Sequence, residues 1–168
     1  MVRGDSILKQ FNRNDFTIGS LEDELRVDDL CRKLLKDFHQ HLLRNGVPPL
    51  DAGTMAHGAD YYLRDYLVSA RSRNLFQEKE GDVRTFAATW YIVSTLEPKA
   101  EVLEGHLSGV REFYRFLHSQ GLISGEYLSQ IEKECDGISW YTERIESFWN
   151  IRDDGYLAWE RECSLKER

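Results

Sequence analysis

Apolar residues recur three and four positions apart along most of this 168-residue chain, which is the spacing of one face of an α-helix. The first such stripe predicts a helix over about 20–45. Further stripes predict helices over about 51–73, 82–97, 98–121, 124–134 and 139–151, with a last helix from Asp154 or Gly155. No stretch alternates β-branched and polar residues over the length of a strand. The pattern therefore predicts an all-α fold, a compact helical bundle. The first predicted helix runs from Ser20 to Asn45, with one apolar face formed by Leu30, Cys31, Leu34, Leu35, Phe38 and Leu42.

Residues that start and stop helices sharpen these boundaries. Gly46, followed by Pro48 and Pro49, ends the first helix, because glycine closes a helix and proline cannot continue it. A start at Ser20 and a later start near Asp28 both fit the sequence. The same reasoning predicts a stop of the fourth helix at Gly121 and a start of the fifth after Ser124.

The third and fourth helices have the clearest predicted inner faces. Asp82 is the expected N-cap of the third helix, whose inner face is predicted to hold Val83, Phe86, Ala87, Trp90 and either Val93 or Ser94. The fourth helix begins near Pro98, and its predicted stripe is Leu103, Leu107, Val110, Phe113, Tyr114 and Leu117. Burial of these six side chains is expected to stabilise the fold by about 1.5–3 kcal/mol each, which is more than nearby polar contacts contribute.

Length and composition favour one domain in a reducing compartment. Residues 1–19 are polar and irregular and predict a flexible or draped N-terminal arm, and residues 20–168 predict a single helical domain. No apolar run is long enough to cross a membrane, and the first residues lack the features of a signal peptide. The lack of a long apolar run predicts no membrane partner. The three widely spaced cysteines indicate reduced thiols, so we expect a cytoplasmic protein.

The stretch from Gly58 to Ser124 has a further pattern. It reads GADYYLRDYLVSARSRNLF, then GDVRTFAATWYIVSTL, then PKAEVLEGHLSGVREFYRFLHSQGLIS. This order resembles the core-binding (SAM-like) N-terminal domain of tyrosine recombinases and phage integrases, where a helix ending in "FL" and a short helix precede "hLsgvRxFYxFLxxxGxI". The resemblance implies a SAM-like four-helix unit over about 54–135 and a prokaryotic or phage origin. The residues after this unit predict acidic, aromatic helices over 138–168.

The resemblance does not extend to catalysis. The family cuts DNA with a separate C-terminal domain that supplies an Arg, a Lys, an H-x-x-R box, a further His or Trp, and a Tyr nucleophile. Only 45 residues follow Ile123 here. His41 and Arg44 spell H-x-x-R, but upstream of the matched segment, and cations near a helix C-terminus have a simpler electrostatic explanation.

Other catalytic and metal chemistry has no sequence support. His39 and His41 point to different faces of a helix, so they cannot easily share an ion, and no CxxC pair is present. G-x-S-x-G, P-loop and G-x-G-x-x-G motifs are also missing. Cys31 precedes Arg32 and Lys33, but its place on the apolar stripe predicts a buried, inert thiol. We expect a protein without enzyme activity, cofactor or metal.

Basic residues in the integrase-like stretch are candidates for DNA contact. Residues 54–123 hold 8 basic and 9 acidic side chains, which is not the cationic excess typical of a DNA-binding domain. Acidic residues such as Glu78, Glu80 and Glu112 interleave with the cations, so solvated helix faces with pairs such as Asp60–Arg64 are the alternative interpretation. The candidate DNA-binding residues are Arg71, Arg73, Lys79, Arg84, Arg111 and Arg115.

The C-terminal region combines acidic and aromatic residues. Residues 124–168 hold 6 basic and 11 acidic side chains, which accounts for most of the net charge of −7. Such a region is a poor DNA surface but a candidate protein-binding surface, since aromatic residues concentrate at interface hot spots. The alternative is that the last helices fold back and cap the bundle. The candidate partner-binding residues are Trp140, Trp149 and Trp159.

Two functions follow from these patterns. The first is a non-catalytic helical module that resembles an integrase core-binding domain and binds DNA or a recombinase-like partner. The second is a protein–protein interaction or regulatory bundle with no role on nucleic acid. Self-association is open in both.

Overall fold

The computed structural model describes Leu8 and residues 12–165. Helices and the turns between them make up this described part, and no strand occurs in it. The predicted all-α fold is confirmed. Residues 1–7 and 9–11 of the predicted N-terminal arm, and residues 166–168, lie outside the described residues.

The helices match the predicted segments closely. A 3-10 turn (Arg13–Phe16) leads into α1 (Leu21–Arg44), and α2 (Pro49–Asp60) continues without a break into a π-helical segment (Tyr61–Ala70). A second continuous rod consists of α3 (Asp82–Thr85), a π-helical segment (Phe86–Trp90) and α4 (Tyr91–Ser94). The remaining helices are α5 (Ala100–Ser119), α6 (Gly125–Cys135), α7 (Ile138–Trp149) and α8 (Tyr156–Leu165).

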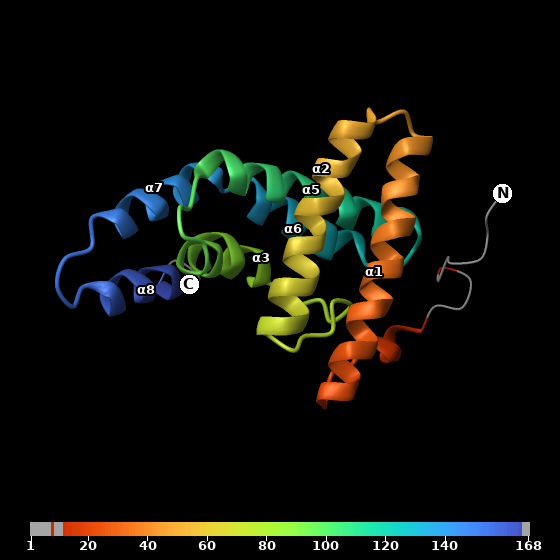
Figure 1. The fold of residues 1–168 in the computed structure, drawn as a ribbon, viewed down its shortest axis with the longest axis horizontal. Coiled ribbons are helices and arrows are strands. Elements are labelled where there is room, and N and C mark those ends of the chain that lie inside the picture. Colours follow the sequence, from red (N-terminus) through yellow and green to blue (C-terminus); the bar gives the residue numbers. More distant parts are fainter. Residues whose placement is uncertain (1–7, 9–11, 166–168) are drawn as a thin grey trace.

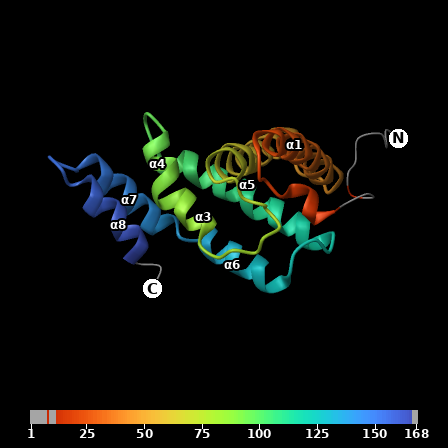
Figure 2. The same ribbon diagram turned by 90° about the horizontal axis from the view of Figure 1, so that it is seen from below.

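The helices form an elongated body. The rods α1 and α2 lie side by side as a hairpin, and α5 crosses α2 and continues toward α6 (Figure 1). α7 and α8 form a second hairpin, which packs against α5 and the rod that contains α3 and α4 (Figure 2). The turn between α7 and α8 lies at one end of the longest axis of the molecule.

Several predicted boundaries are confirmed by cap geometry. The Ser20 hydroxyl accepts a hydrogen bond from the Asp23 amide, so α1 starts there and not near Asp28. Ser124 caps α6 in the same way by accepting from the Tyr127 amide. Gly46, the predicted stop of α1, has a left-handed backbone with φ of 83°. Glycine adopts this conformation at little cost in free energy because it has no Cβ.

The predicted N-cap role of Asp82 is wrong. The cap position belongs to Gly81, whose φ of 92° suits glycine, and the Glu134 carboxylate of α6 accepts hydrogen bonds from the amides of Gly81 and Arg84 at the start of this helix. Asp82 instead lies inside the first turn and is buried, with its Oδ2 atom 3.2 Å from Nε of Arg73. The ion pair explains why a buried carboxylate is tolerated at this position.

The predicted inner face of the third helix is correct only in its first half. Val83, Phe86 and Ala87 are buried, but Trp90 is only partly buried and Val93 is 40% exposed. Tyr91 and Ile92 take the inner positions. The π-helical turn at Phe86–Trp90 explains the shift, because its wider turn rotates all later residues relative to a regular α-helix.

The predicted stripe of α5 is confirmed in full, as its six members are all buried at the centre of the bundle. Phe113 packs edge-on against Phe38 of α1, with ring centroids 5.4 Å apart. Tyr114 has no exposed surface, and Cys31 of α1 is buried as predicted.

The contact between α2 and α5 depends on glycine. A Cβ atom added to Gly109 of α5 would lie 2.2 Å from the carbonyl oxygen of Met55, and one added to Gly58 would lie 2.8 Å from Cα of His106. Gly58, which weakens α2 as an isolated helix, is therefore needed for the close approach of the two backbones.

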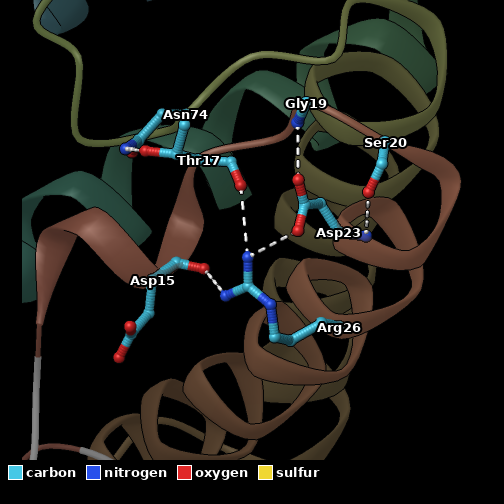
Figure 3. A network of polar contacts seen from close by, with 7 residues as sticks. All are labelled: Asp15, Thr17, Gly19, Ser20, Asp23, Arg26 and Asn74. Carbon is cyan, nitrogen blue, oxygen red and sulfur yellow. Dashed lines mark hydrogen bonds and ion pairs between the residues drawn. The ribbon is translucent and has the colours of Figure 1, made fainter.

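Residues 12–19 are held on the body of the protein. Phe16 is buried, with its ring edge-on to Phe76 at a centroid distance of 4.9 Å. The Arg26 guanidinium donates hydrogen bonds to the carbonyl oxygens of Asp15 and Thr17, and Asn74 donates to the Thr17 hydroxyl (Figure 3). This part of the predicted arm is thus draped along α1.

Candidate functional site

The candidate DNA-binding residues of α5 are engaged in ion pairs with acidic side chains. Arg115 contacts Glu112 of its own helix at 2.8 Å and Glu132 of α6 at 2.7 Å. Arg111 pairs with Asp136, just after α6. The hydrogen bond to Glu132 is the largest of the contacts that raise the pKa of Arg115. The two arginines therefore link α5 to α6, and phosphate would have to compete with carboxylates for them.

Three further candidates surround Asp82. The side chain of Arg73 is only 15% exposed and pairs with the Asp82 carboxylate. Burial raises the pKa of Asp82, while the positive charges of Arg73, Lys79 and Arg71 oppose this rise. Arg71 also lies over the ring of Tyr66, 5.9 Å from its centroid. Of these three, Arg71 and Lys79 are exposed cations, and Arg73 is a structural one.

Arg84 has a different environment. Its guanidinium lies 5.8 Å from the ring centroid of Trp140, and Nε and Nη2 are buried without a hydrogen bond in the described part of the chain. The six candidates thus occupy three settings: the α5–α6 contact, the surroundings of Asp82, and the contact with Trp140.

The three candidate partner-binding tryptophans differ in exposure. Trp149 is 57% exposed, Trp140 is partly buried, and Trp159 is only 5% exposed. Trp159 therefore offers little exposed surface to a partner, because its ring packs against Arg144 and Phe148 of α7. Here the alternative interpretation, in which the last helices cap the bundle, describes its position better.

The residue that fixes Trp159 is Arg144, which the sequence patterns did not single out. Its guanidinium carbon lies 3.8 Å from the Trp159 ring centroid, and Nε donates to the carbonyl oxygen of Ala88 at 3.0 Å. Nη2 donates to the Thr89 hydroxyl, and Nη1 to the carbonyl oxygen of Trp159. The Trp159 indole N–H in turn donates to the carbonyl oxygen of Arg144. This side chain, only 2% exposed, joins α7, α8 and the segment Phe86–Trp90.

The far end of the α7–α8 hairpin is both apolar and acidic. Trp149 is the last residue of α7, and Tyr156 and Leu157 are the first two of α8; they are 57%, 38% and 58% exposed. The turn that these residues flank lies at one end of the molecule (Figure 1). We call these three residues the hairpin tip. Phe148 lies beneath it, with its ring 6.0 Å from that of Trp149 and 5.1 Å from that of Trp159. Acidic residues that are exposed on the same hairpin are Glu143, Glu146, Asp153, Asp154, Glu160 and Glu162.

The two thiols that the structure describes are poor nucleophiles. Cys31 and Cys135 are both buried, and burial raises the pKa of each to about 12. Among the described residues no three His, Cys, Asp or Glu side chains group as a metal site would require. Within the same residues, no helix has the length and apolar character needed to cross a membrane.

Comparison with known proteins yields no relative. No family model matches the chain, and neither a curated protein nor a solved structure matches it. The geometry alone therefore carries the functional proposal.

Proposed function

We propose that this chain is a non-catalytic helical module that binds a protein partner through its α7–α8 hairpin. The observation that carries the proposal is the hairpin tip, where Trp149, Tyr156 and Leu157 expose apolar surface at the end of a hairpin that Arg144 anchors. The remaining helices, including the unit over about 54–135, act as the scaffold. A kinship with integrase core-binding domains, and a location in the cytoplasm, stay predictions.

Charge indicates the kind of partner. The exposed acidic side chains on the hairpin would repel a second copy of the same surface. A partner segment with apolar residues and a rim of lysine or arginine complements both features of the tip. Exposed tryptophan is also the residue type most enriched at hot spots.

A DNA-binding role receives less support. Arg73, Arg111 and Arg115 are engaged by Asp82, Asp136, Glu112 and Glu132, and the chain carries a net charge of −7. DNA binding depends on cations that are free to replace counterions on phosphates. The other three candidates, Arg71, Lys79 and the partly buried Arg84, provide too small a cationic surface.

The test uses an amphipathic peptide of about 18 residues, with lysine and leucine at helical spacing, as a model of such a segment. Fluorescence anisotropy of the labelled peptide measures its affinity for the full chain. Trp149→Ala combined with Leu157→Ala should weaken binding by about 30-fold, which corresponds to about 2 kcal/mol for a hot spot. The matched control is Leu25→Ala with Leu50→Ala, which removes two apolar side chains from α1 and α2 that are even more exposed than those of the hairpin tip.

Two outcomes would contradict the proposal. One is equal loss of peptide affinity in the control variant. The other is binding of duplex DNA to the chain at about 50 mM salt, with an affinity that falls by roughly two orders of magnitude at about 200 mM salt. The variant Arg111→Glu with Arg115→Glu would then no longer bind DNA. That second result would support the nucleic-acid function.

A further inference from the structure

A cavity of about 470 Å³ lies between the N-terminal segment and the loop that precedes α3, far along the chain from the α7–α8 hairpin. Its volume falls in the range of small-molecule sites. The walls come from two segments, with Arg13, Asn14, Thr17 and Ile18 on one side and Ser72, Asn74, Phe76 and Gln77 on the other.

The lining is rich in hydrogen-bond donors and contains no carboxylate. It has one cation, Arg13, in a protein whose acidic residues outnumber its basic ones by seven. Among the described residues, Arg13 makes one long hydrogen bond of 3.4 Å, to the carbonyl oxygen of Gly121, so most of its five N–H donors have no partner within this part of the chain. The amides of Asn14 and Gln77 and the hydroxyl of Ser72 add uncharged donors. Such a set suits an anionic oxygen group.

The two walls are fixed relative to each other. The Asn74 amide donates to the Thr17 hydroxyl (Figure 3). It also donates to the carbonyl oxygen of Arg13 at 3.0 Å, and its own oxygen accepts from the Phe76 amide. The edge-on contact of Phe76 with Phe16 closes the base of the loop. Ser72 has a left-handed backbone, with φ of 47°, an uncommon conformation that tends to occur at binding sites. The cavity therefore exists without rearrangement.

Apolar surface lines part of the same cavity. Ile18 is partly buried, and Phe76 is almost fully buried, so both present a hydrophobic wall next to the donors. A small ligand that fills this space would carry an anionic group for Arg13 and an apolar or aromatic body for this wall.

We propose that this cavity binds a small organic anion, with a carboxylate or phosphate monoester held by Arg13 and its neighbouring donors and an apolar body against Ile18 and Phe76. The site is separate from the hairpin tip, so it stands or fails independently of the proposed protein-binding function.

The test uses phenyl phosphate and benzoate as probes for the two anionic groups, with phenol and inorganic phosphate as controls that lack the charge or the ring. Titrations of the full chain are followed by the amide signals in heteronuclear NMR. We expect at least one of the two probes to bind with a Kd of about 1 mM or tighter, a reasonable value for a ligand of this size. The amide signals of residues 13–18 and 72–77 should move together, and both controls should bind more weakly. Binding of phenyl phosphate alone would assign phosphate monoesters, and binding of benzoate alone would assign carboxylates.

Arg13→Gln should weaken binding at least about tenfold, because it removes the charge and the bidentate donor pair. Arg44→Gln, which removes an exposed arginine at the other end of α1, should leave the affinity unchanged. Thermal unfolding of both variants should match that of the natural chain. The proposal is overturned if neither probe binds at 10 times the expected Kd, if Arg13→Gln binds as well as the natural chain, or if the shifted signals map to α7 and α8.

Discussion

The α2–α5 crossing and the α7–α8 hairpin are held together in opposite ways. At the crossing, two helices approach so closely that Gly58 and Gly109 have no room for a methyl group. In the hairpin, one large side chain, Arg144 of α7, fills the interior and hydrogen-bonds to two other segments, Phe86–Trp90 and α8. The crossing depends on the absence of side chains at Gly58 and Gly109. The hairpin depends on the hydrogen bonds of the Arg144 guanidinium. They should therefore fail in different ways, the first by loss of the whole fold and the second by local opening.

The largest effect is expected at the crossing. Gly109→Ala places a methyl group 2.2 Å from the carbonyl oxygen of Met55, and backbone can move away only by separating α2 from α5. We expect a loss of about 3 kcal/mol or more in the free energy of unfolding, measured by urea denaturation.

The matched control lies one turn earlier on the same helix. A Cβ on Gly105 meets nothing within 4 Å, so Gly105→Ala should stabilise the protein by up to about 1 kcal/mol through helix propensity. Equal destabilisation by both changes would show that the close approach at Gly109 is not what matters.

The next effect separates the two regions directly. Arg144→Met keeps the apolar stem but leaves the carbonyl oxygens of Ala88 and Trp159 without their guanidinium donor. We expect a cost of about 2 kcal/mol, confined to α7 and α8. Hydrogen exchange should become faster in these helices while α5 stays protected. Arg152→Met, at an exposed position, is the control, and a uniform loss of protection in α5 as well would contradict the idea of local opening.

A smaller effect concerns pH at the crossing. Burial, and secondarily the charge of His57, lower the pKa of His106 from 6.5 to about 4. The unfolded chain therefore binds a proton between these values that the folded chain does not, so stability should fall as pH drops from about 6.5 to about 4. His106 is only partly buried, and we expect the contribution to be about 1–2 kcal/mol. Denaturation of His106→Gln over this range should show a flatter pH dependence than the natural chain, and parallel curves would rule out this residue as the cause.

The smallest effect is expected in the hairpin. The Trp159 indole N–H donates to both the Ser147 hydroxyl at 3.0 Å and the Arg144 carbonyl oxygen at 3.1 Å. Ser147→Ala removes one of two acceptors, so the cost should be about 0.5 kcal/mol. A loss as large as that of Arg144→Met, measured by the same hydrogen exchange, would mean that the hydroxyl and not the guanidinium secures Trp159.

Much of the fold could be predicted because it depends on local rules. The α5 stripe follows from helical spacing, and the ends of α1 and α6 follow from Ser20, Gly46 and Ser124. The prediction that Val93 or Ser94 faces inward failed, since both are exposed, because a π-helical turn changes the spacing that the prediction assumes.

The candidate site could be predicted less well. Residue type identified the cations and the tryptophans, but not which of them have partners. Arg111 and Arg115 are bound by carboxylates of α6, and Trp159 is buried by Arg144, whose hydrogen-bond partners Ala88 and Trp159 lie 56 and 15 positions away.

The sequence by itself determined where the helices lie, how most of them begin and end, and which faces are apolar, because these properties depend on residues within a few positions of each other. Only the tertiary structure decided which charges are neutralised, which tryptophan is exposed, why Gly58 and Gly109 are glycines, and that the N-terminal segment and the loop before α3 border an open cavity. These properties depend on contacts between segments far apart along the chain, and neither spacing nor composition specifies which segments meet.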